Sequence, residues 1–323
     1  MSSHHWLTAW LGLELNTLSI LPIIIKSHHP RATEAATKYF LIQATAAALI
    51  LFASTLTAWQ TGNWSITHTS PQTTTIITIA IMLKLGLAPL HAWYPEVLQG
   101  STMSTALIIS TWQKLAPLTL LYLINNHLPS NTILLIGFTS ALIGGWVGLN
   151  QTQTRKIMAL SSVAHMGWLI LTLNLDPHLT TTTMTIYITM TTAMFLALNA
   201  TATKTLTDMG TTWSQSPLLT TMMMVTLLSL GGLPPLAGFS PKWLILNSLC
   251  SMKLLLLSLI MALASLPSLF FYVRLAYFTA LTTPPNTTNT HYKWRFKTPT
   301  TYGLAPTMMM TTLLLPLTHM MIT

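Results

Sequence analysis

Apolar runs of about twenty residues recur along the chain, separated by short polar segments. Ten runs fall near residues 5–25, 36–59, 73–93, 102–124, 132–149, 157–175, 181–203, 218–249, 254–281 and 301–322. A helix of about 20 apolar residues crosses the hydrocarbon core of a bilayer. Only 6% of the residues are charged and the mean hydropathy is +0.57, whereas the surface of a soluble domain needs far more charge. The sequence therefore predicts an all-α polytopic membrane protein with about ten transmembrane helices.

Basic residues are concentrated in alternate loops. One set of loops carries most of the lysines and arginines: 26–31, 150–156, the stretch from Lys204, and 282–300. The other set contains only Lys253: 60–72, 125–131, 176–180 and 250–253. The positive-inside rule then predicts one orientation, with the basic loops on the side of synthesis and both termini opposite. Loop 282–300 also contains aromatic residues, which indicates either an interfacial or partner-docking segment or a solvated loop with membrane-belt anchors.

Two of the apolar runs are interrupted in the same way. Residues 86–96 align without gaps on residues 232–242, and five of the eleven positions are identical, including the glycine and two prolines. Proline removes a backbone donor and clashes with the preceding turn, so each helix must break there. Paired breaks in two halves of a chain are typical of inverted-repeat transporters and mark their ion path. Two ordinary kinked helices in a biased composition are the alternative.

Few ionisable groups lie inside the apolar runs. Each costs about 2.5–3.5 kcal/mol at mid-helix on insertion scales, so each needs a reason. Five are candidates for a proton relay: Glu14, Lys84, Lys114, His165 and Lys242. A buried lysine beside a carboxylate forms a site whose protonation can be switched, and neighbouring members of such a row would titrate together.

Each candidate also has a structural interpretation. Glu14 could pair with a lysine without moving protons, and Lys84 and Lys114 could extend toward an interface. Lys242 lies close to the second break. His165, like His91 in the first break, could be a hydrogen-bonded packing residue, although histidine titrates in the range that suits proton transfer.

Other chemistry finds little support in the sequence. The single cysteine, Cys250, excludes an internal disulfide framework and a cysteine-based metal or iron–sulfur site supplied by this chain alone. The sequence contains no nucleotide-binding glycine motif, no metal-ligand spacing and no catalytic triad. The net charge of +9 is scattered between apolar runs and forms no aromatic-studded patch, so we expect no nucleic-acid partner. Nor does the start of the chain show a cleavable signal or transit peptide.

The chain resembles the antiporter-like membrane subunits of respiratory complex I. The resemblance covers essentially all of it and rests on WLGLELN at 10–16, HPRATEAATKYF at 29–40, KLGLAPLHAWYPEV at 84–97, WQKLAP at 112–117, GGWVGLNQTQ at 144–153 and LPPLAGFSPKW at 233–243. The family usually has a further apolar span before the Ser-Ser-His-Trp-like start.

The resemblance implies an inner-membrane subunit of mitochondria whose basic loops face the matrix. It implies a first repeat over about 1–124, a second over about 132–281 and a C-terminal helix over about 301–322. The family's relay residues carry over one by one: its glutamate to Glu14, its first-break lysine to Lys84, its central lysine to Lys114 and its second-half lysine to Lys242. His165 is a further candidate for this relay because of its place inside an apolar run, apart from the resemblance.

The resemblance also implies partners and cofactors. The partners would be neighbouring antiporter-like and small membrane subunits, supernumerary subunits and lipids such as cardiolipin. This chain itself would bind no cofactor, because NADH, FMN, iron–sulfur clusters and ubiquinone would be bound by other subunits.

The function expected is proton pumping coupled to NADH oxidation and ubiquinone reduction. Glu14 and Lys84 would form the switchable pair, Lys114 the central relay, and Lys242 the exit-side or inter-subunit relay. Two other classes remain open. A self-contained cation/proton exchanger would transport as a single purified chain, and a purely structural spacer would tolerate neutralisation of Lys84 or Glu14.

Overall fold

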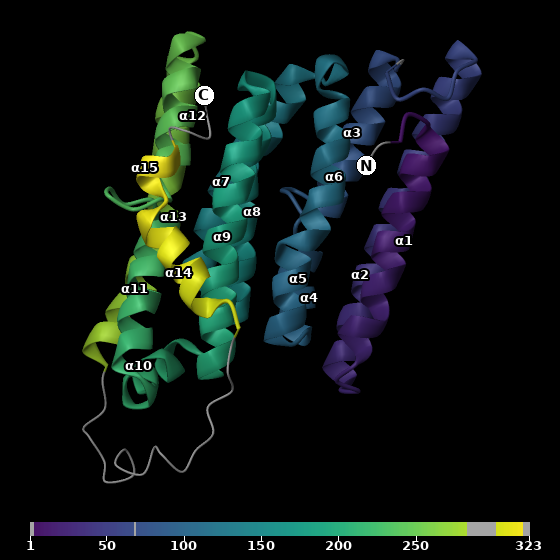
Figure 1. Ribbon diagram of the computed structural model, residues 1–323. Helices are drawn as coiled ribbons and strands as arrows, with labels where there is room; N and C mark the ends of the chain where they lie inside the picture. Colours follow the sequence, from purple (N-terminus) through teal and green to yellow (C-terminus); the bar gives the residue numbers. More distant parts are fainter. Residues whose placement is uncertain (1–2, 68, 283–301, 319–323) are drawn as a thin grey trace.

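The computed structural model describes residues 3–67, 69–282 and 302–318, which form a bundle of helices (Figure 1). The helices are α1 (Trp6–Ile25), α2 (Pro30–Thr61), α3 (Pro71–Leu85), α4 (Trp93–Gly100), α5 (Met103–Ser110), α6 (Trp112–Leu123), η1 (Asn125–His127), α7 (Ser130–Gly148), α8 (Thr154–Leu175), α9 (Pro177–Thr201), α10 (Leu206–Gln215), α11 (Pro217–Gly231), α12 (Phe239–Ser251), α13 (Leu255–Leu281), α14 (Leu304–Leu313) and α15 (Leu315–Thr318).

Each of the ten apolar runs is mostly helical where the structure describes it, and the helix is interrupted at the two breaks, residues 86–92 and 232–238. In these parts of the chain, seven segments are long and apolar enough to span a membrane: α1, α2, α5 with α6, α7, α8, α9 and α13. The pairs α3/α4 and α11/α12 are the two interrupted runs, and α14 with α15 occupies the last one. The prediction of an all-α polytopic protein with broken helices near 84–96 and 231–242 is confirmed.

The predicted run at 102–124 is confirmed as a membrane-spanning segment over Met103–Leu123, which consists of α5 and α6 with a local irregularity between them. Thr111, with φ −112° and ψ −68°, separates α5 from α6. The Thr111 hydroxyl donates to the Leu107 carbonyl at 2.8 Å, and such back-bonding competes with the regular helical pattern. The break leaves Lys114 in the first turn of α6.

The stretch after Lys204 is a correction, since it was expected to be a loop and forms the short helix α10. Thr205 caps this helix, and Asp208 three residues later completes a capping box. Hydrogen bonds from the backbone and side chain of Thr205 lower the pKa of Asp208. The α10 helix lies across one end of the bundle (Figure 1).

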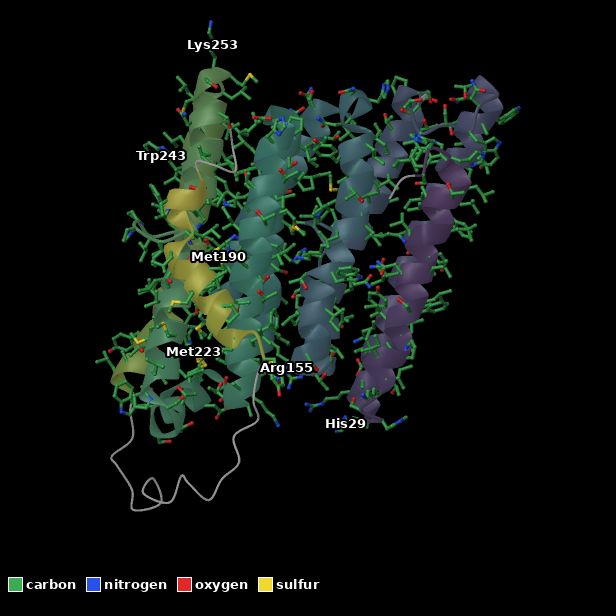
Figure 2. The ribbon with its side chains drawn as sticks, in the orientation of Figure 1. His29, Arg155, Met190, Met223, Trp243 and Lys253 are labelled. Carbon is green, nitrogen blue, oxygen red and sulfur yellow. The ribbon has the colours of Figure 1, made fainter. Side chains whose placement is uncertain are left out.

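The basic loops that the structure describes lie at one end of the bundle, and the loop that contains Lys253 lies at the other (Figure 2). His29 and Arg155 lie at one end and Lys253 at the other (Figure 2). This arrangement agrees with the alternation of basic and non-basic loops along the chain. Most of the predicted interfacial segment at 282–300 lies outside the described residues.

The two broken helices are built alike and run in opposite directions. Gly86 ends α3 with φ +70° and Gly232 ends α11 with φ +80°, a left-handed conformation that glycine adopts without steric cost. Each break contains a cis prolyl bond, at Ala88–Pro89 and Pro234–Pro235. The α3 helix runs from the Lys253 end to mid-bundle, whereas α11 starts from the opposite end (Figure 1). This is the geometry of an inverted repeat.

The centre of the bundle is α8, which is buried along nearly its whole length. It packs closely against α7 through glycines. A Cβ on Gly144 would lie 2.7 Å from the Ala164 amide nitrogen, and one on Gly167 would lie 2.4 Å from the Ser140 hydroxyl. Small residues let membrane helices approach this closely. His165 follows Ala164 and lies two residues before Gly167. The close packing of α7 against α8 therefore keeps His165 in the interior.

Candidate functional site

Two small cavities lie in the interior near the two helix breaks. The first, of about 20 Å³, is large enough for about one water. Its polar lining comes from α1, α2, α3, α4 and α6: Asn16, Thr17, Tyr39, Gln43, Lys84, Tyr94, Gln113 and Lys114. The structure therefore brings Lys84 and Lys114, 30 positions apart in the sequence, to one cavity.

Lys84 is buried, with 6% of its surface exposed. It stands in the last turn of α3, just before the break. Gln43 of α2 donates to its main-chain carbonyl at 3.3 Å. The amine of Lys84 has no hydrogen-bond partner among the described residues. Buried amines are rarely left unpaired, so this one is suited to a water in the adjoining cavity.

Glu14 lies on α1 and forms no ion pair with Lys84 in the described structure. Within the described residues, the ion pairs under 4.0 Å are Lys38 with Glu34 and Lys38 with Glu96. One carboxylate oxygen of Glu14 is buried without a hydrogen-bond partner there. A direct Glu14–Lys84 pair is therefore absent from this conformation, and a water or a side-chain movement would have to join them.

Lys114 is held by a tyrosine from α9. Its amine donates to the hydroxyl of Tyr187 at 3.3 Å, and that hydroxyl donates to the carbonyl of Ser110 at 3.0 Å. The carbonyl is free because the helix breaks at Thr111, so that the Lys114 amide nitrogen donates to Thr111 instead. The break therefore creates the acceptor that orients Tyr187 beside the lysine.

Aromatic rings surround the Lys114 amine, which lies 4.8 Å from the centre of the Tyr94 ring and 5.3 Å from that of Tyr187. Only 3% of Lys114 is exposed. Ring faces attract a cation and give it partial compensation away from water. A charged amine can thus be accommodated at this depth without a carboxylate in contact.

The second cavity lies beside the second break. It too measures about 20 Å³, and its polar lining includes His165, Thr183, Tyr187 and Lys242. Nε2 of His165 lies 3.2 Å from the hydroxyl of Tyr272 on α13. The ring centres of His165 and Tyr187 are 5.9 Å apart. Thus His165 and Lys242 share one cavity, and Tyr187 links it to Lys114.

The position of Lys242 follows from the break itself. It lies in the first turn of α12, and its amine donates to the carbonyl of Gly231, the last residue of α11, at 2.8 Å. Unpaired carbonyls at the end of a helix carry partial negative charge. The lysine therefore bridges the two half-helices.

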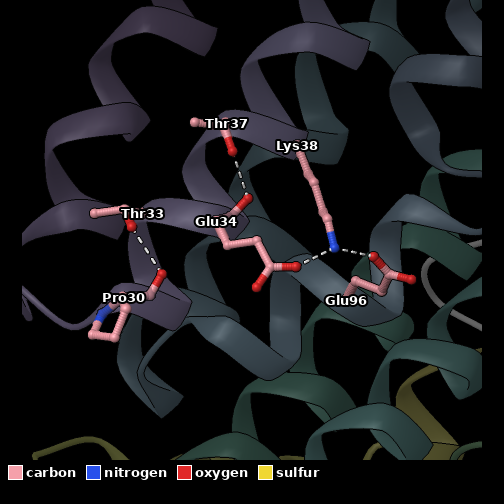
Figure 3. Close-up of polar contacts among 6 residues, drawn as sticks. All are labelled: Pro30, Thr33, Glu34, Thr37, Lys38 and Glu96. Atoms are coloured by element: carbon pink, nitrogen blue, oxygen red, sulfur yellow. Dashed lines mark hydrogen bonds and ion pairs between the residues drawn. The ribbon is translucent and has the colours of Figure 1, made fainter.

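A further charged cluster lies at the basic end of the bundle. Lys38 of α2 contacts Glu34 at 2.5 Å and Glu96 of α4 at 2.7 Å (Figure 3). These side chains are partly exposed and line an open cavity of about 300 Å³ with Arg31 and Lys156. Lys38 thus joins α2 to α4 at this end of the bundle through its ion pair with Glu96.

Sequence reasoning missed several polar partners of the relay candidates. Asn16 and Gln113 exchange two amide hydrogen bonds between α1 and α6, at 2.9 and 3.1 Å. Tyr187, Tyr272 and Gln43 were also overlooked. Amides inside apolar runs are costly unless paired, so Gln43, Gln113 and Asn16 could have been singled out. The tyrosines carry no comparable signal, because tyrosine is already frequent where membrane helices meet the interface.

Within the described residues, the structure contains no group of three or more His, Cys, Asp and Glu side chains that could bind a metal ion.

Known proteins resemble this chain over its full length. Residues 3–267 match a family model described as NADH:quinone oxidoreductase/Mrp antiporter, TM, and residues 269–322 match NADH dehydrogenase subunit 2 C-terminus. NADH-ubiquinone oxidoreductase chain 2 of Carassius auratus is 53% identical over 324 residues, and that of Struthio camelus is 49% identical over 323. Each alignment covers 100% of this chain and 93% of the relative.

A solved structure has the same fold. It is a chain of respiratory complex I from Thermus thermophilus with bound aureothin, with a TM-score of 0.82 and 25% sequence identity. The similarity covers 98% of this chain and 75% of that one.

Proposed function

Since the chain belongs to the family of NADH-ubiquinone oxidoreductase chain 2, we propose that its two interior cavities form a proton path across the membrane. The chain is an antiporter-like, multi-pass membrane subunit of respiratory complex I, an NADH:ubiquinone oxidoreductase. The observation that carries the proposal is that Lys84 and Lys114 line one cavity while His165 and Lys242 line the other. Each cavity has space for about one water, the usual bridge between such groups.

Each relay residue has a role that follows from its place. Glu14 and Lys84 exchange a proton through water or a side-chain movement. Lys114 receives the proton in the same cavity. Like charges repel strongly in a medium of low dielectric constant. When Lys84 takes up a new proton, Lys114 therefore loses the proton it already carries more readily. His165 and Lys242 then carry it on toward the exit or a neighbouring subunit.

Energy for this transport must come from partner subunits. Moving one charge against the membrane potential costs about 2.3 kcal/mol per 100 mV. The driving reaction is the reduction of ubiquinone by NADH elsewhere in the complex, through FMN and iron–sulfur clusters in other subunits. The proposed location is the mitochondrial inner membrane with the basic loops in the matrix. The sides of the chain would be covered by neighbouring antiporter-like, small membrane and supernumerary subunits, and by lipids such as cardiolipin.

The test compares Glu14→Gln and Lys84→Met with wild type in the assembled complex. Quinone-reductase turnover and proton pumping are measured on the same membranes, with assembly checked by native electrophoresis. Lys253→Met is the matched control, because it removes a lysine at the exposed loop between α12 and α13. We expect both activities to fall in the two relay variants only. Wild-type pumping in both would show that these charges are structural and would refute the proton path.

A further inference from the structure

We propose that Tyr187 is a further relay residue, and that its hydroxyl is the gate between the two cavities. The inference rests on the proposed function and deepens it, because it names the group that passes the proton from Lys114 to the His165–Lys242 cavity. Tyr187 lies on α9 and is 3% exposed.

Tyr187 contacts both halves of the path. Its hydroxyl accepts a hydrogen bond from Lys114, which lines the first cavity, while its own side chain lines the second. Lys114 does not line the second cavity, and His165 does not line the first. The Lys114–Tyr187 hydrogen bond therefore joins a residue of the first cavity to a residue of the second.

The neighbouring tyrosines are less suited to this role. Tyr94 presents its ring to the Lys114 amine, and its buried hydroxyl has no hydrogen-bond partner among the described residues. Tyr272 lies beyond His165, within hydrogen-bonding distance of its Nε2. The Tyr187 hydroxyl alone among these three both accepts from Lys114 and belongs to a residue of the second cavity.

The direction of the Tyr187 O–H bond makes it a gate. In this conformation the hydroxyl donates to the carbonyl of Ser110. A main-chain carbonyl cannot pass a proton on, so the path is closed. Rotation about the C–O bond would turn the hydrogen toward the second cavity. Because a hydroxyl both donates and accepts, the path would then be continuous.

The transfer step balances in protons. The Lys114 ammonium gives a proton to the Tyr187 oxygen as its N–H bond breaks and a new O–H bond forms. The original O–H bond of Tyr187 breaks, and its proton passes through a water in the second cavity to a ring nitrogen of His165. Lys114 becomes neutral, Tyr187 ends as the neutral phenol, and His165 becomes positively charged.

Tyr187→Phe tests the gate, because it removes the hydroxyl and keeps the ring. Pumping and quinone reduction are measured in the assembled complex, normalised to its content, beside Lys114→Met. The matched control is Tyr277→Phe, since Tyr277 is 58% exposed on α13. Loss of one proton-transfer group typically slows a step by about a hundredfold or more. A step slowed this far becomes rate-limiting, so Tyr187→Phe should lower the pumping rate by roughly tenfold or more.

Three outcomes separate the gate from the path. Loss of pumping in both Tyr187→Phe and Lys114→Met, with Tyr277→Phe unaffected, supports the gate. Loss in Lys114→Met alone overturns the gate and leaves the proton path standing. Wild-type pumping in both overturns the gate together with the path it serves.

A second variant covers the case in which Tyr187→Phe fails to assemble, because it leaves the Ser110 carbonyl without its donor. Tyr187→His keeps a side chain that can donate to Ser110 and transfer protons. We expect pumping to persist, with an altered solvent deuterium isotope effect because the transferring group has changed. An assembled Tyr187→His complex with the wild-type isotope effect would overturn the proposal, because proton transfer at position 187 would then not affect the rate.

Discussion

The amine of Lys242 donates a hydrogen bond to the carbonyl of Gly231, 2.8 Å away, and so joins the start of α12 to the end of α11. The next residue, Gly232, is in the left-handed region at φ +80°, and a Cβ there would lie 2.9 Å from both Cδ and Nζ of the lysine. The position of the lysine thus depends on a glycine ten residues before it.

Gly232→Ala should lower both stability and proton pumping. A side chain in the left-handed conformation costs about 1–2 kcal/mol, and the new methyl group would displace the Lys242 amine. The measurements are thermal stability of the assembled complex and its pumping rate. Gly62→Ala is the matched control, because Gly62 has φ +72° and a Cβ there would meet no described atom within 4 Å. Equal effects of the two variants on pumping would contradict the dependence on Lys242.

Gly144→Ala should impair assembly by forcing α7 away from α8. Its Cβ would lie 2.7 Å from the amide nitrogen of Ala164, a main-chain atom that cannot rotate away. Overpacking of this kind costs about 1–3 kcal/mol. The amount of assembled complex and its melting temperature measure the effect. Gly12→Ala on α1 is the control, since its Cβ would meet no described atom within 4 Å, and a similar defect there would point to a general intolerance of alanine.

Arg155→Ala should loosen the junction between α4 and α8. Its guanidinium donates to the carbonyls of Gln99 and Ser101, at 3.0 and 2.5 Å, where α4 ends. Charge-assisted hydrogen bonds contribute about 1.5–3 kcal/mol each, and a carbonyl left without its donor adds to the loss. Faster hydrogen exchange of the amides around residue 100 would report the change. Lys156→Ala should leave the exchange rate unchanged, and equal acceleration in both variants would argue for a general charge effect.

The ion pair between Lys38 and Glu96 should contribute little to stability. Both side chains are partly exposed, and exposed pairs contribute about 0–1 kcal/mol because water screens them. A double-mutant cycle with Lys38→Met and Glu96→Gln should give a coupling energy in this range, decreasing as salt is added. Pumping should stay near wild type in Glu96→Gln. A large fall in pumping would instead place this cluster in the proton path.

Local features of the sequence predicted the helices and most of the candidate relay residues. Apolar runs of membrane-spanning length, the glycines and prolines of the breaks, and the ionisable residues within apolar runs all act through their immediate neighbours in the chain. Their consequences can therefore be read without knowing which helices meet. The correspondence of Gly86 with Gly232 in sequence reappears as two left-handed helix ends.

Tertiary structure decided which of these residues meet. Tyr187 lies 73 positions after Lys114, and no spacing in the sequence indicates that α9 places its hydroxyl between a lysine and the free carbonyl of Ser110. The missing contact between Glu14 and Lys84 is likewise a property of how α1 and α3 pack. Spans, breaks and charges follow from local chemistry, whereas the two cavities and the tyrosine between them follow from long-range packing, because each wall comes from a different helix.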